Sequence, residues 1–117
     1  MQGRVDIQRL IHNAVGGEEY RHRFALRCFT MDPGAVIPEH NHGYVQAVFV
    51  LKGKLEIWSG GNVIIGKPGD VVYFGESEPH GLKNVSPETA SFLCIIDCPG
   101  EETCLAPAEE EGAGAGC

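Results

Sequence analysis

Short apolar runs recur along the chain and are separated by clusters of glycine, proline, asparagine and aspartate, and the run at residues 55–58 (LEIW) alternates with polar neighbours. A period of two is the pattern of a strand with one buried face, and the clusters mark turns. Turn signals about every ten residues are typical of a β-sandwich or barrel, so we expect an all-β fold. The pattern predicts strands over residues 22–31, 45–51, 55–58, 63–65, 71–74 and 91–96.

The two ends of the chain follow this pattern less clearly. Residues 5–11 (VDIQRLI) fit either an early strand or one turn of helix. From Pro107 onwards the residues are mostly Glu, Gly and Ala, which cannot bury an apolar face, so we expect a flexible acidic tail over 107–117. A chain of 117 residues suits one domain, which we place at residues 1–106.

The charge of the chain is uneven. It has 9 basic and 16 acidic residues, a net charge of −7, and no Lys or Arg follows Lys83. The body is therefore close to neutral and offers no basic surface for nucleic acid or an anionic membrane. No run approaches the roughly 18 apolar residues of a membrane helix, and the first six residues lack the apolar core of a signal peptide, so we expect a cytoplasmic protein.

The five cysteines do not suggest a disulfide framework. Their number is odd and no secretion signal accompanies them, so we expect buried or free thiols. The spacing Cys94-x3-Cys98-x5-Cys104 is not one that we can assign to a zinc site. The roles of these three and of Cys117 stay open.

Three of the five histidines lie in the turn-rich middle of the chain. His40 and His42 form an H-x-H pair at the start of a predicted strand, where residues i and i+2 point to one face. Gln46 follows at even spacing, and His80, if it comes from a neighbouring strand, supplies a third imidazole. Neutral imidazoles that converge on one point suit a divalent first-row metal.

The same residues carry a resemblance to the cupin superfamily. Gly34-x5-His40-x-His42-x3-Gln46-x6-Gly53, over residues 34–53, resembles the first cupin motif. Gly69-x5-Gly75-x-Ser77-x2-His80-x3-Asn84, over residues 69–84, resembles the second. Each spacing is kept, so the chain resembles a small single-domain cupin of the conserved-barrel type. The departures are Gln46 for the usual Glu, Gly75 for Pro and Ser77 for Gly.

This resemblance implies a double-stranded β-helix, or jelly-roll barrel, and a homodimer in which the N-terminal segment is exchanged. It also implies one divalent transition metal (Zn, Fe, Ni or Mn) held by His40, His42, Gln46 and His80. A Gln ligand is neutral, which leaves the metal its full charge and makes it a stronger Lewis acid. Alternatively, Gln46 does not ligate, and three histidines leave open positions.

Three functions remain open from the sequence. The first is a metal-dependent enzyme that isomerises or ring-opens a small oxygenated substrate, such as a sugar acid or another carboxylate, by Lewis-acid chemistry. Cupins that open unsaturated uronates have a similar three-His-plus-Gln set, but this chain lacks their basic residue near the C-terminal end. The second is an iron-dependent dioxygenase, and the third a non-catalytic module that binds a small ligand or metal. No catalytic residue is assigned, and no further cofactor is expected.

Some other residues near the motifs have weaker signals. Arg21, Arg23 and Arg27 alternate, so they share one face of the predicted strand, which we expect to be the outer one. On the inner face they would bind a carboxylate or phosphate. We expect Phe49 in the core and Glu78 in a solvated loop.

Overall fold

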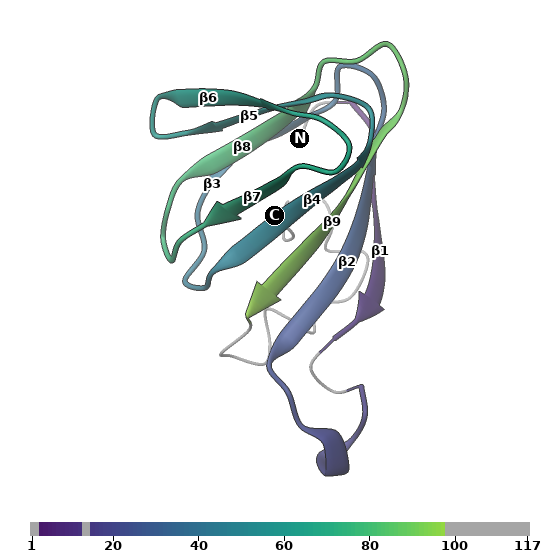
Figure 1. Cartoon of the computed structure of the whole chain (residues 1–117), viewed down its shortest axis with the longest axis vertical. Helices are drawn as coiled ribbons and strands as arrows, with labels where there is room; N and C mark the ends of the chain where they lie inside the picture. The colour runs from purple at the N-terminus through teal and green to yellow at the C-terminus, as the bar shows by residue number, and fades with distance from the viewer. Residues whose placement is uncertain (1–2, 13–14, 98–117) are drawn as a thin grey trace.

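The computed structural model describes residues 3–12 and 15–97, which form two antiparallel sheets. The first sheet has the strand order β1 (Val5–Ile11), β2 (Phe24–Met31), β9 (Ala90–Asp97), β4 (Gln46–Lys52) and β7 (Val71–Phe74). The second has the order β3 (Val36–His40), β8 (His80–Asn84), β5 (Leu55–Ser59) and β6 (Asn62–Gly66). Figure 1 shows the two layers, with the short 3₁₀ helix η1 (Glu18–Tyr20) in the β1–β2 connection. The all-β jelly-roll class is confirmed. The expected tail at 107–117 lies outside the described residues.

Alternation along the strands builds the core between the sheets. In β2, every second residue from Ala25 to Met31 is buried, and the same period holds from Ala90 to Ile96 in β9. β2 and β9 pair without a break, so Phe29 lies opposite Phe92, and the two rings stack with centroids 4.9 Å apart. Truncating either ring to Ala would cost about 3–5 kcal/mol of stability.

The strand predictions hold for six of the nine strands, to within two residues at each end. The segment 5–11 is strand β1, which pairs with β2 of the same chain, so the helical alternative is wrong. β3 and β8 were not predicted, because their signals are weak. β3 contains Pro38, which lies at a break in its register with β8, and β8 (HGLKN) contains glycine and lysine.

The expectation that the three arginines face outward is wrong for Arg27. Arg21 and Arg23 precede β2, and Arg23 forms an exposed ion pair with Asp97 at 3.0 Å. Arg27 lies within the strand, in phase with the buried Ala25 and Phe29, and is only 6% exposed. The three arginines differ because β2 begins at Phe24. Only Arg27 lies inside the strand, and only residues inside a strand follow its alternation between the two faces.

The expectations for Phe49 and the cysteines also need correction. Phe49 is half-buried on the outer face of β4, out of phase with the buried Val48 and Val50. Cys28 is free and half-buried. Cys94 is fully buried and disulfide-bonded, so it is not the thiol that we expected. An odd number of cysteines excludes complete pairing but not a single pair.

No helix in the described part of the chain has both the length and the hydropathy needed to cross a membrane.

Candidate metal centre

Three histidines meet where β3, β8 and the β3–β4 turn come together. His40 is the last residue of β3, and its partner in the register is His80, the first residue of β8. His42 lies in the turn after β3, not at the start of a strand as we expected. The ring centroids of His40 lie 4.7 Å from His42 and 4.5 Å from His80. One ligand nitrogen from each ring lies within 4.8 Å of the others.

Backbone carbonyls orient two of these rings. Nδ1 of His40 lies 2.7 Å from the carbonyl oxygen of Pro38, and Nδ1 of His80 lies 2.9 Å from that of Glu78. A carbonyl oxygen can only accept a hydrogen bond, so each Nδ1 carries the proton and each Nε2 keeps a lone pair. Such a bond on the far nitrogen is the usual way in which proteins fix the tautomer of a metal-binding histidine.

Gln46 brings an amide to the same place from the start of β4. Its side chain is 2% exposed, and its Nε2 donates to Nε2 of His80 at 3.0 Å. Gln46 Oε1 and His42 Nε2 are both buried, and neither has a hydrogen-bond partner within residues 3–12 and 15–97. A buried acceptor without a donor costs about 1–3 kcal/mol, and a cation would satisfy both. The donor set therefore fits a metal ion, although the amide oxygen, not the nitrogen, would be the ligand atom.

His42 is kept neutral by its surroundings. Burial, followed by the neighbouring His40 and His80 and the charge of Arg27, lowers the pKa of His42 to about 3. Its ring stacks on Tyr44 with centroids 4.7 Å apart. At neutral pH no proton has to leave this imidazole before it can ligate a metal.

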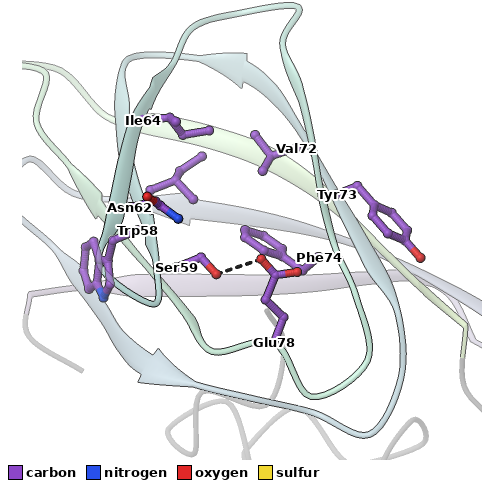
Figure 2. A pocket seen from close by; sticks show the side chains of 9 residues that line it. Trp58, Ser59, Asn62, Ile64, Val72, Tyr73, Phe74 and Glu78 are labelled. Atoms are coloured by element: carbon purple, nitrogen blue, oxygen red, sulfur yellow. Dashed lines mark hydrogen bonds between the residues drawn. The ribbon is translucent and has the colours of Figure 1, made fainter.

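The loop between β7 and β8 holds His80 in place. The amide of Ser77 donates to the carbonyl oxygen of His42 at 2.7 Å, which joins the loops of the two motifs. Ser77 has a φ of 63°, a left-handed conformation that explains why glycine is usual at this motif position. The Glu78 carboxylate accepts a 2.8 Å hydrogen bond from the hydroxyl of Ser59 (Figure 2) and another of 2.8 Å from the amide of Gly75.

Glu78 is thus not the solvated loop acid that we expected. The hydrogen bonds from Gly75 and Ser59 lower its pKa. Its backbone carbonyl is the acceptor for Nδ1 of His80, so the side chain anchors the group that orients the ring. Nothing in the spacing of the motif signals this role, because it depends on the position of Ser59 in β5.

A pocket of about 160 Å³ adjoins this loop (Figure 2). Phe74 lines it and also stacks on His80, with centroids 4.2 Å apart. His80 itself does not line the pocket, so the two are connected through Phe74. The residues that line it are Ile57, Trp58, Ser59, Asn62, Ile64, Val72, Tyr73, Phe74 and Glu78.

A buried cation lies close to the histidines. Arg27 points inward from β2, and its Nη2 lies 3.6 Å from Sγ of Cys94. A hydrogen bond links its side chain to Tyr44, which stacks on His42. Burial lowers the pKa of Arg27 and raises that of Tyr44.

His22 is not part of the histidine cluster. Its Nε2 lies 2.8 Å from the carbonyl oxygen of Val15.

Comparisons with known proteins agree with this architecture. A model of the Cupin_2 family, described as a cupin domain, matches residues 27–96. A predicted oxalate decarboxylase from Thermotoga maritima is 23% identical with a TM-score of 0.72, over 82% of this chain and 82% of that one. KdgF from Halomonas sp. is 20% identical with a TM-score of 0.66, over 80% of this chain and 78% of that one.

The Cupin_2 domain of an XRE family transcriptional regulator from Enterobacter cloacae is also similar. It is 25% identical with a TM-score of 0.67, over 82% of this chain and 98% of that one. The comparison with curated proteins gave no match. Because the family match spans more than half of its length, this chain belongs to the Cupin_2 family of cupin domains.

Proposed function

We propose that the protein is a metal-binding cupin in which His40, His42 and His80 hold one divalent transition metal, with Gln46 as a fourth ligand. The observation that carries this proposal is the orientation of the rings. The Nδ1 atoms of His40 and His80 are bound to backbone carbonyls, while the ligand atoms of all three rings lie within 4.8 Å of one another. Ligand nitrogens at about 2.0–2.1 Å from one metal lie at most about 4.2 Å apart, so the three rings would move slightly closer together on binding.

We further propose that the protein is an enzyme that acts on a small oxygenated substrate bearing a carboxylate. The metal would act as a Lewis acid that polarises a carbonyl or carboxylate oxygen. Arg27, 6% exposed and hydrogen-bonded to Tyr44, supplies a fixed positive charge whose field reaches His42. A guanidinium binds a carboxylate through paired hydrogen bonds, so Arg27 would hold and orient the substrate.

The metal content of the untagged full chain tests the first part of this proposal. Mass spectrometry should find about one divalent metal per chain in the wild type and much less in His80→Ala. His22→Ala is the matched control, because it removes an imidazole outside the cluster and should keep the metal. Circular dichroism checks that both variants fold. If all three proteins hold no metal, even after anaerobic loading, the metal site is refuted.

The identity of the metal then decides between the activities. If the purified protein contains zinc, nickel or manganese, sugar acids are screened for isomerisation or ring opening. With iron, oxygen consumption is measured with small diols and carboxylates, and uptake would favour the dioxygenase over the Lewis-acid enzyme. A metal-loaded protein that binds carboxylates but turns none of them over would favour the non-catalytic module.

A further inference from the structure

The pocket of Figure 2 lies where the edges of the two sheets face each other. β6 and β7 are consecutive in the chain, but each is the last strand of a different sheet, and they do not pair with each other. Inward side chains of these two strands therefore line an opening. We call the hollow of about 160 Å³ between them, lined by the residues given above, the β6–β7 pocket.

Two walls of this pocket are apolar side chains from opposite sheets. Ile64 pairs with the buried Ile57 in the register of β5 and β6, so it points inward. Val72 pairs with the buried Val48 and also points inward. Figure 2 shows Ile64 and Val72 pointing toward each other. Ile64 is nevertheless 48% exposed, so water reaches this apolar hollow, and an apolar ligand group that displaced the water would be stabilised.

The other end of the β6–β7 pocket is polar and anionic. The Glu78 carboxylate lies there beside Ser59, and Asn62 pairs with Ser59 at the end of the β5–β6 hairpin (Figure 2). Among the described residues that line the pocket, Glu78 alone is charged. None of the ion pairs within residues 3–12 and 15–97 includes it. The pocket therefore combines apolar walls with a negative charge that no Lys or Arg in the described part of the chain pairs with.

The carboxylate of Glu78 has room for further hydrogen bonds. Its two oxygens accept one bond each, from the hydroxyl of Ser59 and from the amide of Gly75. A carboxylate offers about four lone-pair sites, so about two remain for a ligand. An ammonium group is the matching partner, because it brings three donors and a positive charge. The side-chain oxygens of Ser59 and Asn62 are further acceptors at the same end.

Other classes of ligand match this combination less well. Glu78 would repel a carboxylate or a phosphate, and a neutral alcohol would leave its charge unmatched. A divalent cation needs several oxygen ligands, whereas Ile57, Ile64, Val72 and Phe74 present only hydrocarbon. The volume sets the size of the apolar part, because an apolar cavity of roughly 150 Å³ holds one benzene molecule.

We propose that the β6–β7 pocket binds a small organic ammonium ion. Its charged head would lie on the Glu78 carboxylate, and its apolar part, no larger than about a benzene ring, would lie between Ile64 and Val72. This site is distinct from the candidate metal centre, because Phe74 lines the pocket whereas His80, on which Phe74 stacks, does not. The proposal therefore does not depend on a bound metal.

Titration of the full chain with benzylammonium, followed by NMR in the presence of a chelator, tests this site. The methyl signals of Ile64 and Val72 should shift, with a dissociation constant in the millimolar range that is usual for so small a ligand. Benzyl alcohol has the ring without the charge, and methylammonium has the charge without the ring. Each should bind several-fold more weakly, and benzoate should not bind.

A lysine side chain of a partner protein has the same chemistry as a free amine, so a second pair of probes separates these two sources. Nα-acetyl-lysine methylamide and n-butylammonium carry the same head on the same apolar stem. Tighter binding of the lysine derivative would assign the pocket to a lysine of a partner. Tighter binding of n-butylammonium would assign it to a free amine.

Two variants of the chain test the apolar and the charged end separately. Ile64→Trp fills the hollow and should abolish binding. Ile65→Trp is its matched control, because Ile65 is the next residue of β6, is 47% exposed and does not line the pocket. Glu78→Gln removes the charge and should weaken benzylammonium binding by about tenfold. Glu76→Gln, at an exposed position outside the pocket, should bind as the wild type does.

Three results would overturn the proposal. The first is the absence of shifts at Ile64 and Val72 up to about 20 mM benzylammonium, well above the expected dissociation constant. The second is equal binding of benzylammonium and benzyl alcohol, because the charge would then play no part. The third is unchanged binding in both Ile64→Trp and Glu78→Gln. Because the chelator removes metal throughout, none of these results depends on whether the histidines bind one.

Discussion

The hydroxyl of Ser59 donates a 2.8 Å hydrogen bond to the carboxylate of Glu78, across from β5 to the loop before His80. The same carboxylate accepts from the amide of Gly75, and the backbone carbonyl of Glu78 accepts from Nδ1 of His80. One side chain therefore ties the loop to the sheet, and through its own carbonyl it sets the direction of a candidate metal ligand.

Removing this anchor should weaken metal binding without removing a ligand. We expect Glu78→Ala to lower the affinity for zinc by about 10- to 100-fold, as is usual when the support of a metal-binding histidine is lost. Glu78→Gln, which keeps one acceptor oxygen, should have a smaller effect. Competition against a coloured chelator measures both affinities.

The neighbouring Glu76 provides the control for this experiment. Its side chain is exposed, so Glu76→Ala should bind zinc like the wild type. If Glu78→Ala binds equally well, the Ser59–Glu78 contact only stabilises the loop and does not position His80. An equal loss in both variants would point to the net charge of the loop instead.

Much of the fold followed from the sequence, because β2, β4, β7 and β9 are short, mainly apolar runs that end at strong turn signals. β3 and β8 did not, because Pro38 and Gly81 weaken their local patterns, and pairing between the two strands makes them part of a sheet. Gly81 is nevertheless required, since a Cβ there would clash with the Trp58 ring. No local pattern encodes a close approach of this kind.

The candidate site was harder to predict than the fold. The histidine spacing identified the three rings that the structure brings together. The roles of Arg27 and Glu78, in contrast, depend on tertiary structure: Arg27 points to the inner face of β2, and Glu78 contacts Ser59 in β5. The sequence shows that Arg27 alternates with Ala25 and Phe29. It does not show that the strand begins at Phe24, and this start is what places Arg27 on the inner face of the sheet. Whether these residues bind a metal and a substrate stays a prediction.

Gln46→Glu tests whether residue 46 is a ligand. Without metal, a carboxylate at this 2% exposed position should destabilise the protein, because a buried charge is expensive to desolvate. With metal, the same carboxylate adds a negative ligand, so the rise in melting temperature on adding zinc should exceed that of the wild type. Differential scanning fluorimetry with and without zinc measures both effects.

Gln46→Leu is the companion variant, because it removes the amide and adds no charge. If residue 46 ligates, this variant should show a smaller zinc-induced shift than the wild type. Equal shifts in the wild type, Gln46→Glu and Gln46→Leu would mean that the three histidines bind the metal without it.

Acid should destabilise the metal-free protein through His42. Its pKa of about 3 in the folded state lies below the ordinary histidine value of 6.5, so between these pH values the unfolded chain binds a proton that the folded chain does not. Stability should therefore fall as the pH drops from 6.5 towards 3. The lowered pKa of Glu78 acts in the same direction, at pH values below the ordinary glutamate pKa of 4.5.

Urea unfolding at several pH values, in the presence of a chelator, measures this dependence. His42→Asn should unfold with the uptake of about one proton fewer than the wild type between pH 4 and 6. His22→Asn serves as the control and should keep the wild-type slope. Parallel slopes for all three proteins would show that His42 is protonated in the folded state at these pH values.

Arg27 should bind the carboxylate of a substrate in the metal-loaded protein. We expect Arg27→Met to weaken the binding of oxalate, a minimal dicarboxylate probe, by about tenfold or more, because a charge-assisted hydrogen bond contributes about 1.5–3 kcal/mol. Arg27→Lys should restore part of the affinity, since it keeps the charge but loses the paired geometry. Isothermal titration calorimetry of the zinc-loaded proteins gives the affinities, and their zinc content should be unchanged.

Arg23→Met is the control for lost positive charge. Arg23 lies just before β2 but is exposed and paired with Asp97, so its removal should leave oxalate binding unaltered. If both variants bind oxalate as the wild type does, Arg27 is a structural residue and the carboxylate is held by the metal alone. Loss of binding together with loss of zinc would mean that Arg27 supports the histidines, because its charge acts on His42. The zinc content separates these two cases, which the affinity alone does not.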